Sequence, residues 1–91
     1  MEFTWSEAKR ATNIKVHGLD FIEARSVFGG MTYTFEDDRF SYGEQHFVTL
    51  GLLAGIYVSV VHTESEHEIR IISFRKATKR ESQIYVDAIQ N

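Results

Sequence analysis

The chain has 91 residues, a length typical of one domain, and a formal net charge of −3 at neutral pH, which gives no global attraction for nucleic acid. Its hydrophobic fraction of 43% favours a packed fold over a disordered segment. The absence of cysteine excludes disulfides, thiolate zinc sites and a cysteine nucleophile. No apolar run approaches the roughly 20 residues that span a bilayer. We therefore expect a single soluble, cytoplasmic domain over residues 1–91 with no membrane contact.

Two helices are predicted near the start of the chain. Thr4 and Glu7 have the spacing of a capping box and predict a helix over about residues 5–16 that ends at Gly18. A second start signal is followed by apolar residues at helical spacing before a pair of glycines. These residues are Asp20, Phe21, Glu23, Ala24, Val27, Phe28, Gly29 and Gly30.

From Met31 onward the hydrophobic period changes to two, which is typical of strands. Four strands are predicted, over residues 31–36, 46–53, 56–63 and 68–76. Thr78 and Glu81 then form another capping box at the start of a closing helix. The expected fold is α+β, with two N-terminal helices, a four-stranded and mostly antiparallel sheet and a C-terminal helix. We expect a site on the sheet face that the helices leave uncovered.

Half of the Lys and Arg residues lie between positions 69 and 80, where there is no Asp or Glu. These cations are Arg70, Arg75, Lys76, Lys79 and Arg80. In a regular strand Arg70 and Lys76 share one face while Ser73 and Arg75 share the other, so alternation alone does not unite them. The start of the closing helix can bring them together into a phosphate site. A solvated surface run of cations is the alternative interpretation.

The segment "HTESEHE" at residues 62–68 has the composition of a metal site. His62, Glu64 and Glu66 share one face of an extended strand. The alternative is a polar turn between two buried strands, and it is favoured because a hairpin redirects side chains and no second ligand cluster occurs. We therefore predict no metal ion and no cofactor.

Three segments together resemble one family. The run "VVHTESEHEIRIISFRKATKRESQIY" (residues 60–85), with "WSEAKRATNIKVHGLDFIEA" (5–24) and "GEQHFVTLGLLAG" (43–55), resembles the BrnT family of bacterial toxins. The resemblance implies a fold similar to the RelE-type endoribonucleases and a type II toxin that cleaves RNA and arrests translation and growth. It also implies a BrnA-like antitoxin that masks the site. The expected complex contains two toxins and two antitoxins, and it contacts operator DNA only through the antitoxin.

The resemblance further implies which residues act. The matching positions are Trp5, Lys9, Asn13, His17, Gly18, His62, Thr63, Arg70, Ser73, Arg75, Thr78 and Glu81. Cleavage by the neighbouring 2′-hydroxyl needs a base, cations for the phosphorane and an acid for the leaving oxygen, but no metal. The expected catalytic residues are Arg70, Arg75, His62 and Ser73, with His62 moving the proton. The expected substrate-binding residues are Lys9, Lys76, Lys79 and Arg80.

Some positions depart from the family pattern. Arginines that relatives carry are replaced in the stretches Gln45-His46 and Gly55-Ile56, Ser6 stands where aspartate is common, and the turn over residues 64–68 is acidic. Fewer cations weaken the grip on a polyanion. These departures motivate a second hypothesis. The protein is then a weakened or inactive toxin homologue that binds the antitoxin in an operon-repressing complex.

Overall fold

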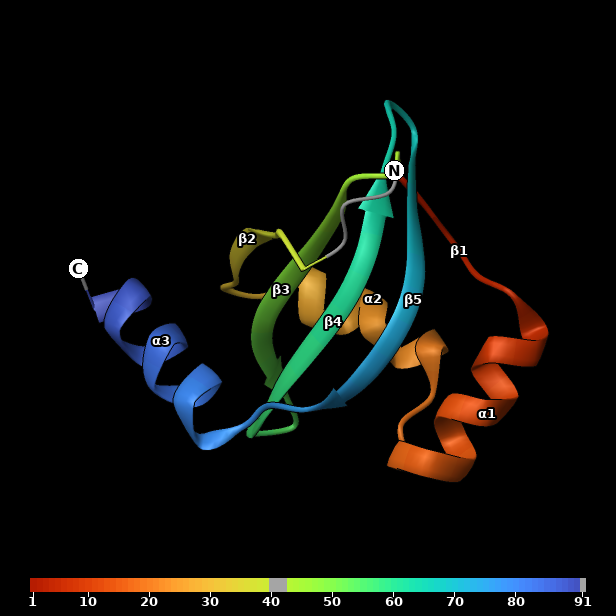
Figure 1. Ribbon diagram of the computed structural model, residues 1–91. Helices are drawn as coiled ribbons and strands as arrows, with labels where there is room; N and C mark the ends of the chain where they lie inside the picture. The colour runs from red at the N-terminus through yellow and green to blue at the C-terminus, as the bar shows by residue number, and fades with distance from the viewer. Residues whose placement is uncertain (40–42, 91) are drawn as a thin grey trace.

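The computed structural model describes residues 1–39 and 43–90, and within these ranges five strands form one sheet surrounded by helices (Figure 1). The strands are β1 (Glu2–Thr4), β2 (Tyr33–Asp37), β3 (His46–Leu53), β4 (Ile56–Glu64) and β5 (Glu68–Lys76). The helices are α1 (Glu7–His17), α2 (Ala24–Phe28) and α3 (Lys79–Gln90), and a 3-10 turn, η1 (Phe21–Glu23), leads into α2. The strand order is β1-β5-β4-β3-β2.

The first helix starts two residues later than predicted, because its cap is Ser6 and not Thr4. The Ser6 hydroxyl accepts a hydrogen bond from the Lys9 N–H at 3.3 Å. Thr4 instead belongs to β1, where its hydroxyl donates to Glu68 Oε1 at 3.0 Å. The predicted helix end is confirmed, since Gly18 has the left-handed φ of 73° that closes a helix.

The other two helix signals are confirmed. Asp20 accepts from the Ile22 N–H at 3.1 Å and starts a helical segment whose first turn is 3-10. At α3, the Thr78 hydroxyl accepts from the Glu81 N–H at 3.1 Å, and Glu81 Oε1 accepts from the Thr78 N–H at 2.9 Å. This reciprocal pair is the capping box that the spacing of the two residues predicts.

The four predicted strands are present, and residues 46–53 and 68–76 have the predicted limits. A two-residue turn joins β3 to β4, with φ of 49° at Ala54 and 81° at Gly55, as a type I′ hairpin requires. The expectation of four strands is wrong, because β1 adds a fifth. It pairs in parallel with β5, with Phe3 opposite Ile69, and its three residues are too few to show an alternating pattern.

Helices cover both faces of the sheet, which corrects the expectation of one uncovered face. On the α2 face, Val58 and Val60 pack against Phe21, Ala24 and Val27. On the α3 face, Val48, Leu50 and Val61 pack against Tyr85. Figure 1 shows α2 behind the sheet, with α3 and α1 on opposite sides of it. Because α3 packs on β2, β3 and β4 while α1 runs beside β5, the α3 face stays open along β5.

Candidate functional site

A β-bulge brings together residues of β5 that regular alternation separates. The register of β4 and β5 shifts between Val61 and His62, so that Thr63 pairs with Arg70, Val61 with Ser73 and Ser59 with Arg75. Residues 59, 61 and 63 of β4 share one face, and their partners share it with them. The predicted separation of Arg70 from Ser73 and Arg75 is therefore wrong, and all three lie on the α3 face.

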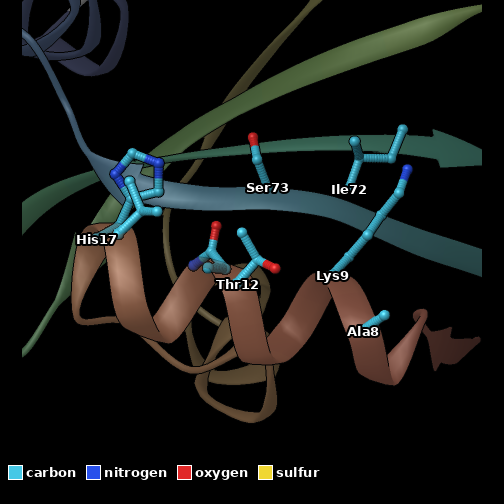
Figure 2. Close-up of a pocket in the computed structure, with 8 residues that line it drawn as sticks. Ala8, Lys9, Thr12, His17, Ile72 and Ser73 are labelled. Atoms are coloured by element: carbon cyan, nitrogen blue, oxygen red, sulfur yellow. The ribbon is translucent and has the colours of Figure 1, made fainter.

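A groove of about 410 Å³ lies between α1 and β5 beside this open part of the α3 face (Figure 2). We call it the α1 groove. Its lining residues are Ala8, Lys9, Thr12, Asn13, Val16, His17, Ile72 and Ser73. In Figure 2 the side chains of Lys9, Thr12 and His17 rise from α1 toward β5. Two residues of the expected site, Lys9 and Ser73, therefore lie at one cavity.

Helical spacing explains why one side of α1 supplies the groove. Lys9, Thr12 and Val16 follow each other at three and four residues, so they project from the same side of the helix. His17 occupies the last turn of α1, next to the Gly18 cap. The resulting surface combines a cation, an imidazole and two hydroxyls, the second being that of Ser73, over an apolar base. Such groups can neutralise the charge of a phosphodiester, donate hydrogen bonds to its oxygens and exchange protons with it.

His17 and Thr12 were not among the expected site residues. Two signals could have found His17, namely its match to the family pattern and its place eight residues after Lys9, about two helical turns along one side of the helix. Thr12 gives no such signal from the sequence.

Arg70 is held by an exposed carboxylate. Its Nη2 donates to both oxygens of Glu44, at 2.8 and 2.9 Å, and the two side chains are 46% and 52% exposed. An ion pair as exposed as this contributes little to stability, so a competing anion can replace Glu44 at small cost.

Arg75 is more firmly held. It makes a bidentate pair with Glu81, at 2.8 and 2.9 Å, and these side chains are only 27% and 17% exposed. Burial alone would raise the pKa of Glu81, but the hydrogen bonds from Arg75 and from the Thr78 backbone outweigh it and lower the pKa. Because Glu81 also caps α3, Arg75 links β5 to the start of that helix.

His62 lies on the α2 face, away from the arginines, since it pairs with Ile71 and not with Ser73. It is 0% exposed, hydrogen-bonded to the Thr49 hydroxyl at 2.7 Å, and its ring packs edge-on against Phe28 and stacks with Phe47. Burial lowers its pKa to about 4, despite hydrogen bonding to the Thr63 backbone. The expected proton-transfer role is therefore at odds with the structure, which gives His62 no access to RNA.

The remaining predicted cations are placed at the far end of β5. Lys76 ends the strand, and Lys79 and Arg80 begin α3. All three are exposed, and none forms an ion pair within residues 1–39 and 43–90. They do not line the α1 groove, so they form a separate exposed cationic segment.

In "HTESEHE" the histidines and acids meet only in separate pairs: His62 Nδ1 lies 3.7 Å from Glu64 Oε1, and His67 Nε2 lies 3.8 Å from Glu66 Oε1. His62 is buried, whereas Glu64 and Glu66 are exposed. Across the described part of the chain, no three His, Asp or Glu side chains gather closely enough to hold a metal ion. Nor is any helix there long and apolar enough to cross a membrane.

The fold and the groove define a small α+β protein with polar and cationic side chains beside an edge of its sheet. A family model described as "Ribonuclease toxin, BrnT, of type II toxin-antitoxin system" matches residues 5–81, and the chain belongs to this family. The resemblance seen in the sequence is thereby confirmed. The family is one of ribonuclease toxins, and a toxin of a type II system has an antitoxin partner. A search of curated proteins gave no match.

Proposed function

We propose that this protein is a metal-independent endoribonuclease that cleaves RNA at the α1 groove and thereby arrests translation and growth. The observation that carries the proposal is that Lys9, His17 and Ser73, from two different elements, line one open groove. Membership of a family of ribonuclease toxins supports the same reaction class.

The reaction uses a nucleophile from the substrate. The 2′-oxygen of the RNA bonds to the neighbouring phosphorus, its proton passes to a base, and the bond from phosphorus to the 5′-oxygen breaks. A proton from an acid neutralises the departing 5′-oxygen, so the products carry a 2′,3′-cyclic phosphate and a 5′-hydroxyl. The protein must supply proton transfer and positive charge at the phosphorane.

The groove residues suit these tasks. His17 is proposed to transfer the proton, because imidazole is the side chain that ordinarily changes charge near neutral pH and His17, unlike His62, is exposed at the groove. Lys9 is proposed to hold the negative charge of the phosphorane, and the hydroxyls of Thr12 and Ser73 to donate hydrogen bonds to its oxygens.

The arginines of the α3 face take different parts in this proposal. Arg70 is proposed to exchange Glu44 for a phosphate of the RNA, because that pair is exposed. Arg75 is proposed to act mainly by fixing α3 through Glu81, since contact with phosphate would break a half-buried bidentate pair. Lys76, Lys79 and Arg80 are proposed to attract RNA through long-range charge.

The antitoxin is proposed to be similar to BrnA and to block the α1 groove in an assembly of two toxins and two antitoxins. Operator DNA would then be bound by the antitoxin alone. Membership of a type II toxin family supports an antitoxin partner, and the net charge of −3 does not favour direct DNA binding by the toxin.

The test of the proposed function is cleavage of RNA by purified protein in EDTA. The expected products end in 2′,3′-cyclic phosphate, and an oligonucleotide with one 2′-deoxy residue at the cleavage position stays intact. Lys9→Gln is expected to lower the rate, whereas Lys15→Gln, a matched change on the same helix outside the groove, is not. Intact RNA after incubation with folded wild-type protein would contradict the proposal.

One observation favours a second function. Glu44 and Glu81 neutralise the two arginines of the α3 face, which favours a protein that binds the antitoxin and does not cleave RNA. Induced expression separates the two functions. Growth arrest that co-expressed antitoxin relieves supports the ribonuclease, and normal growth together with a stable antitoxin complex supports the binding module.

A further inference from the structure

Asn13 is the buried residue of α1, and its amide bonds to three backbone groups outside the helix. Its Nδ2 donates to the Phe74 carbonyl at 2.7 Å and to the Leu19 carbonyl at 2.9 Å. Its Oδ1 accepts from the Phe74 N–H at 3.0 Å. A single side chain thus satisfies the donor and the acceptor of one residue of β5 and also ties α1 to the segment that follows it.

This pattern reproduces the pairing that a neighbouring strand would give. The parallel pairing of β1 with β5 stops at Thr4, opposite Arg70, so β1 leaves the later part of β5 unpaired on that side. There Asn13 takes the place of a strand at Phe74. Two short hydrogen bonds to one residue fix the position of the helix along β5 as well as its distance from it.

We call the hydrogen bonds between the Asn13 amide and the Phe74 backbone the Asn13 clamp, and it lies close to the groove residues. Asn13 lies four residues after Lys9 and four before His17, about one helical turn from each. Its partner Phe74 directly follows Ser73. The clamp therefore joins the two walls of the α1 groove at the point where their functional groups must match.

We infer that Asn13 is a positioning residue for the ribonuclease site: its clamp on Phe74 sets Lys9 and His17 of α1 against Ser73 of β5. The inference rests on the proposed function. Asn13 itself need not touch RNA, because its amide is already used by the backbone. A displacement of reacting groups by about 1 Å can lower a rate by about a hundredfold, so fixing the helix along the strand has a kinetic consequence.

The test compares Asn13→Ala with Arg10→Gln. Arg10 also anchors α1, through a bidentate pair with Asp20 at 2.7 and 2.9 Å, but it holds the helix to the next segment and not to β5. Both variants are examined under conditions where they are fully folded. If Asn13→Ala does not fold, Asn13→Ser, which keeps a hydroxyl at the position, replaces it.

Two measurements are made on each protein, namely kcat and KM for RNA cleavage and the NMR resonances of the His17 ring in the absence of RNA. Asn13→Ala is expected to lower kcat by about ten- to a hundredfold with little change in KM, and to shift the His17 resonances. Arg10→Gln is expected to leave both close to wild type.

Equal effects of the two variants, or wild-type kcat and unshifted His17 resonances in Asn13→Ala, would overturn the inference. If wild-type protein cleaves no RNA, the proposed function fails. In that case the His17 resonances decide alone: a shift in Asn13→Ala but not in Arg10→Gln supports the positioning of His17, and unshifted resonances refute it.

Discussion

His62 and His17 show how the two sides of this sheet differ. His62 lies on the α2 face, fully buried between Phe28 and Phe47, and burial lowers its pKa to about 4. His17 ends α1 and lines an open groove with Lys9 and Ser73. From the sequence His62 is the better candidate, since it sits beside the cationic strand. In the structure His17 is the better candidate, because the face that a residue occupies decides whether it can reach the substrate.

A one-residue irregularity in strand pairing produces this difference. The bulge at Val61 and His62 keeps His62 opposite Ile71, toward α2, and moves Ser73 to the face that carries Arg70. The fully buried residues of β5, Ile69, Ile71 and Phe74, thus pack with the α2 cluster, whereas Arg70 and Ser73 of the proposed site lie on the other face. Substitutions on the two faces should therefore have different effects, the largest being on catalysis.

The first prediction concerns His17. His17→Ala is expected to lower kcat for RNA cleavage by about a hundredfold or more, because general acid–base catalysis contributes about that much. The midpoint of thermal unfolding should change little, since the side chain is exposed. Cleavage of a fluorogenic RNA and a thermal melt measure the two effects. His67→Ala, a change to another exposed histidine, is the control and should cleave normally.

The second prediction concerns stability. His62→Ala is expected to lower the free energy of unfolding by about 3–5 kcal/mol, because it empties a packed site and removes one of the two hydrogen-bond partners of the buried Thr49 hydroxyl, the other being Thr34. Urea denaturation measures this change. The fraction of the His62→Ala protein that is folded at the assay temperature should still cleave RNA. A loss of kcat without a loss of stability would assign His62 to the active site after all.

The third prediction is that the free energy of unfolding depends on pH because of His62. The unfolded chain takes up a proton near the ordinary imidazole pKa of 6.5, whereas folded His62 stays neutral down to about pH 4. The unfolded state therefore binds more protons between these values, so stability is complete above pH 6.5 and falls as the pH drops toward 4. From pH 7 to pH 5 the expected loss is about 2 kcal/mol.

Denaturation at several pH values measures this loss, and His62→Gln provides the comparison. The glutamine variant has no group that titrates at this position, so the slope between pH 6.5 and 4 should be much smaller than in wild type. An identical slope in the two proteins would mean that other groups cause the dependence.

The smallest expected effect concerns Glu44. Glu44→Gln removes the carboxylate that occupies Arg70 and should increase the affinity for RNA by about two- to fivefold at low salt, with no change in stability. Fluorescence anisotropy with a labelled 2′-O-methyl RNA measures the affinity at two salt concentrations. Glu36→Gln removes the same charge on β2, three strands away from β5 in the sheet, and serves as the control. Equal gains in both variants would reflect net charge alone.

Much of the fold could be predicted because its signals are local. The alternation in residues 46–53 and 68–76 and the capping box of Thr78 and Glu81 depend on neighbours in the chain, and all are confirmed. The strand β1 and the bulge that leaves Ile72 without a partner in β4 depend on pairing between distant segments, which no short pattern records. The expected cap at Thr4 is wrong for the same reason, since the Thr4 hydroxyl hydrogen-bonds Glu68, which is 64 residues away in the chain.

The candidate site was predictable to a smaller extent. Lys9 and Ser73 were expected at the site and do line one groove. Their proximity depends on Asn13 holding α1 against β5, a contact between residues 61 positions apart. The burial of His62 and the pairing of Arg75 with Glu81 also arise only when the sheet and α3 have assembled. Residue types thus indicated the chemistry, and tertiary packing selected which of them can take part.

The most direct test of catalysis at the α1 groove is to map where RNA binds. A short 2′-O-methyl RNA, which lacks the nucleophile, is titrated into isotope-labelled protein, and the backbone and histidine resonances are followed by NMR. The shifts are expected to centre on Thr12, His17 and Ser73 and to leave the His62 ring unchanged. Shifts centred on the His62 ring, or on α3 with the α1 groove unaffected, would contradict this expectation.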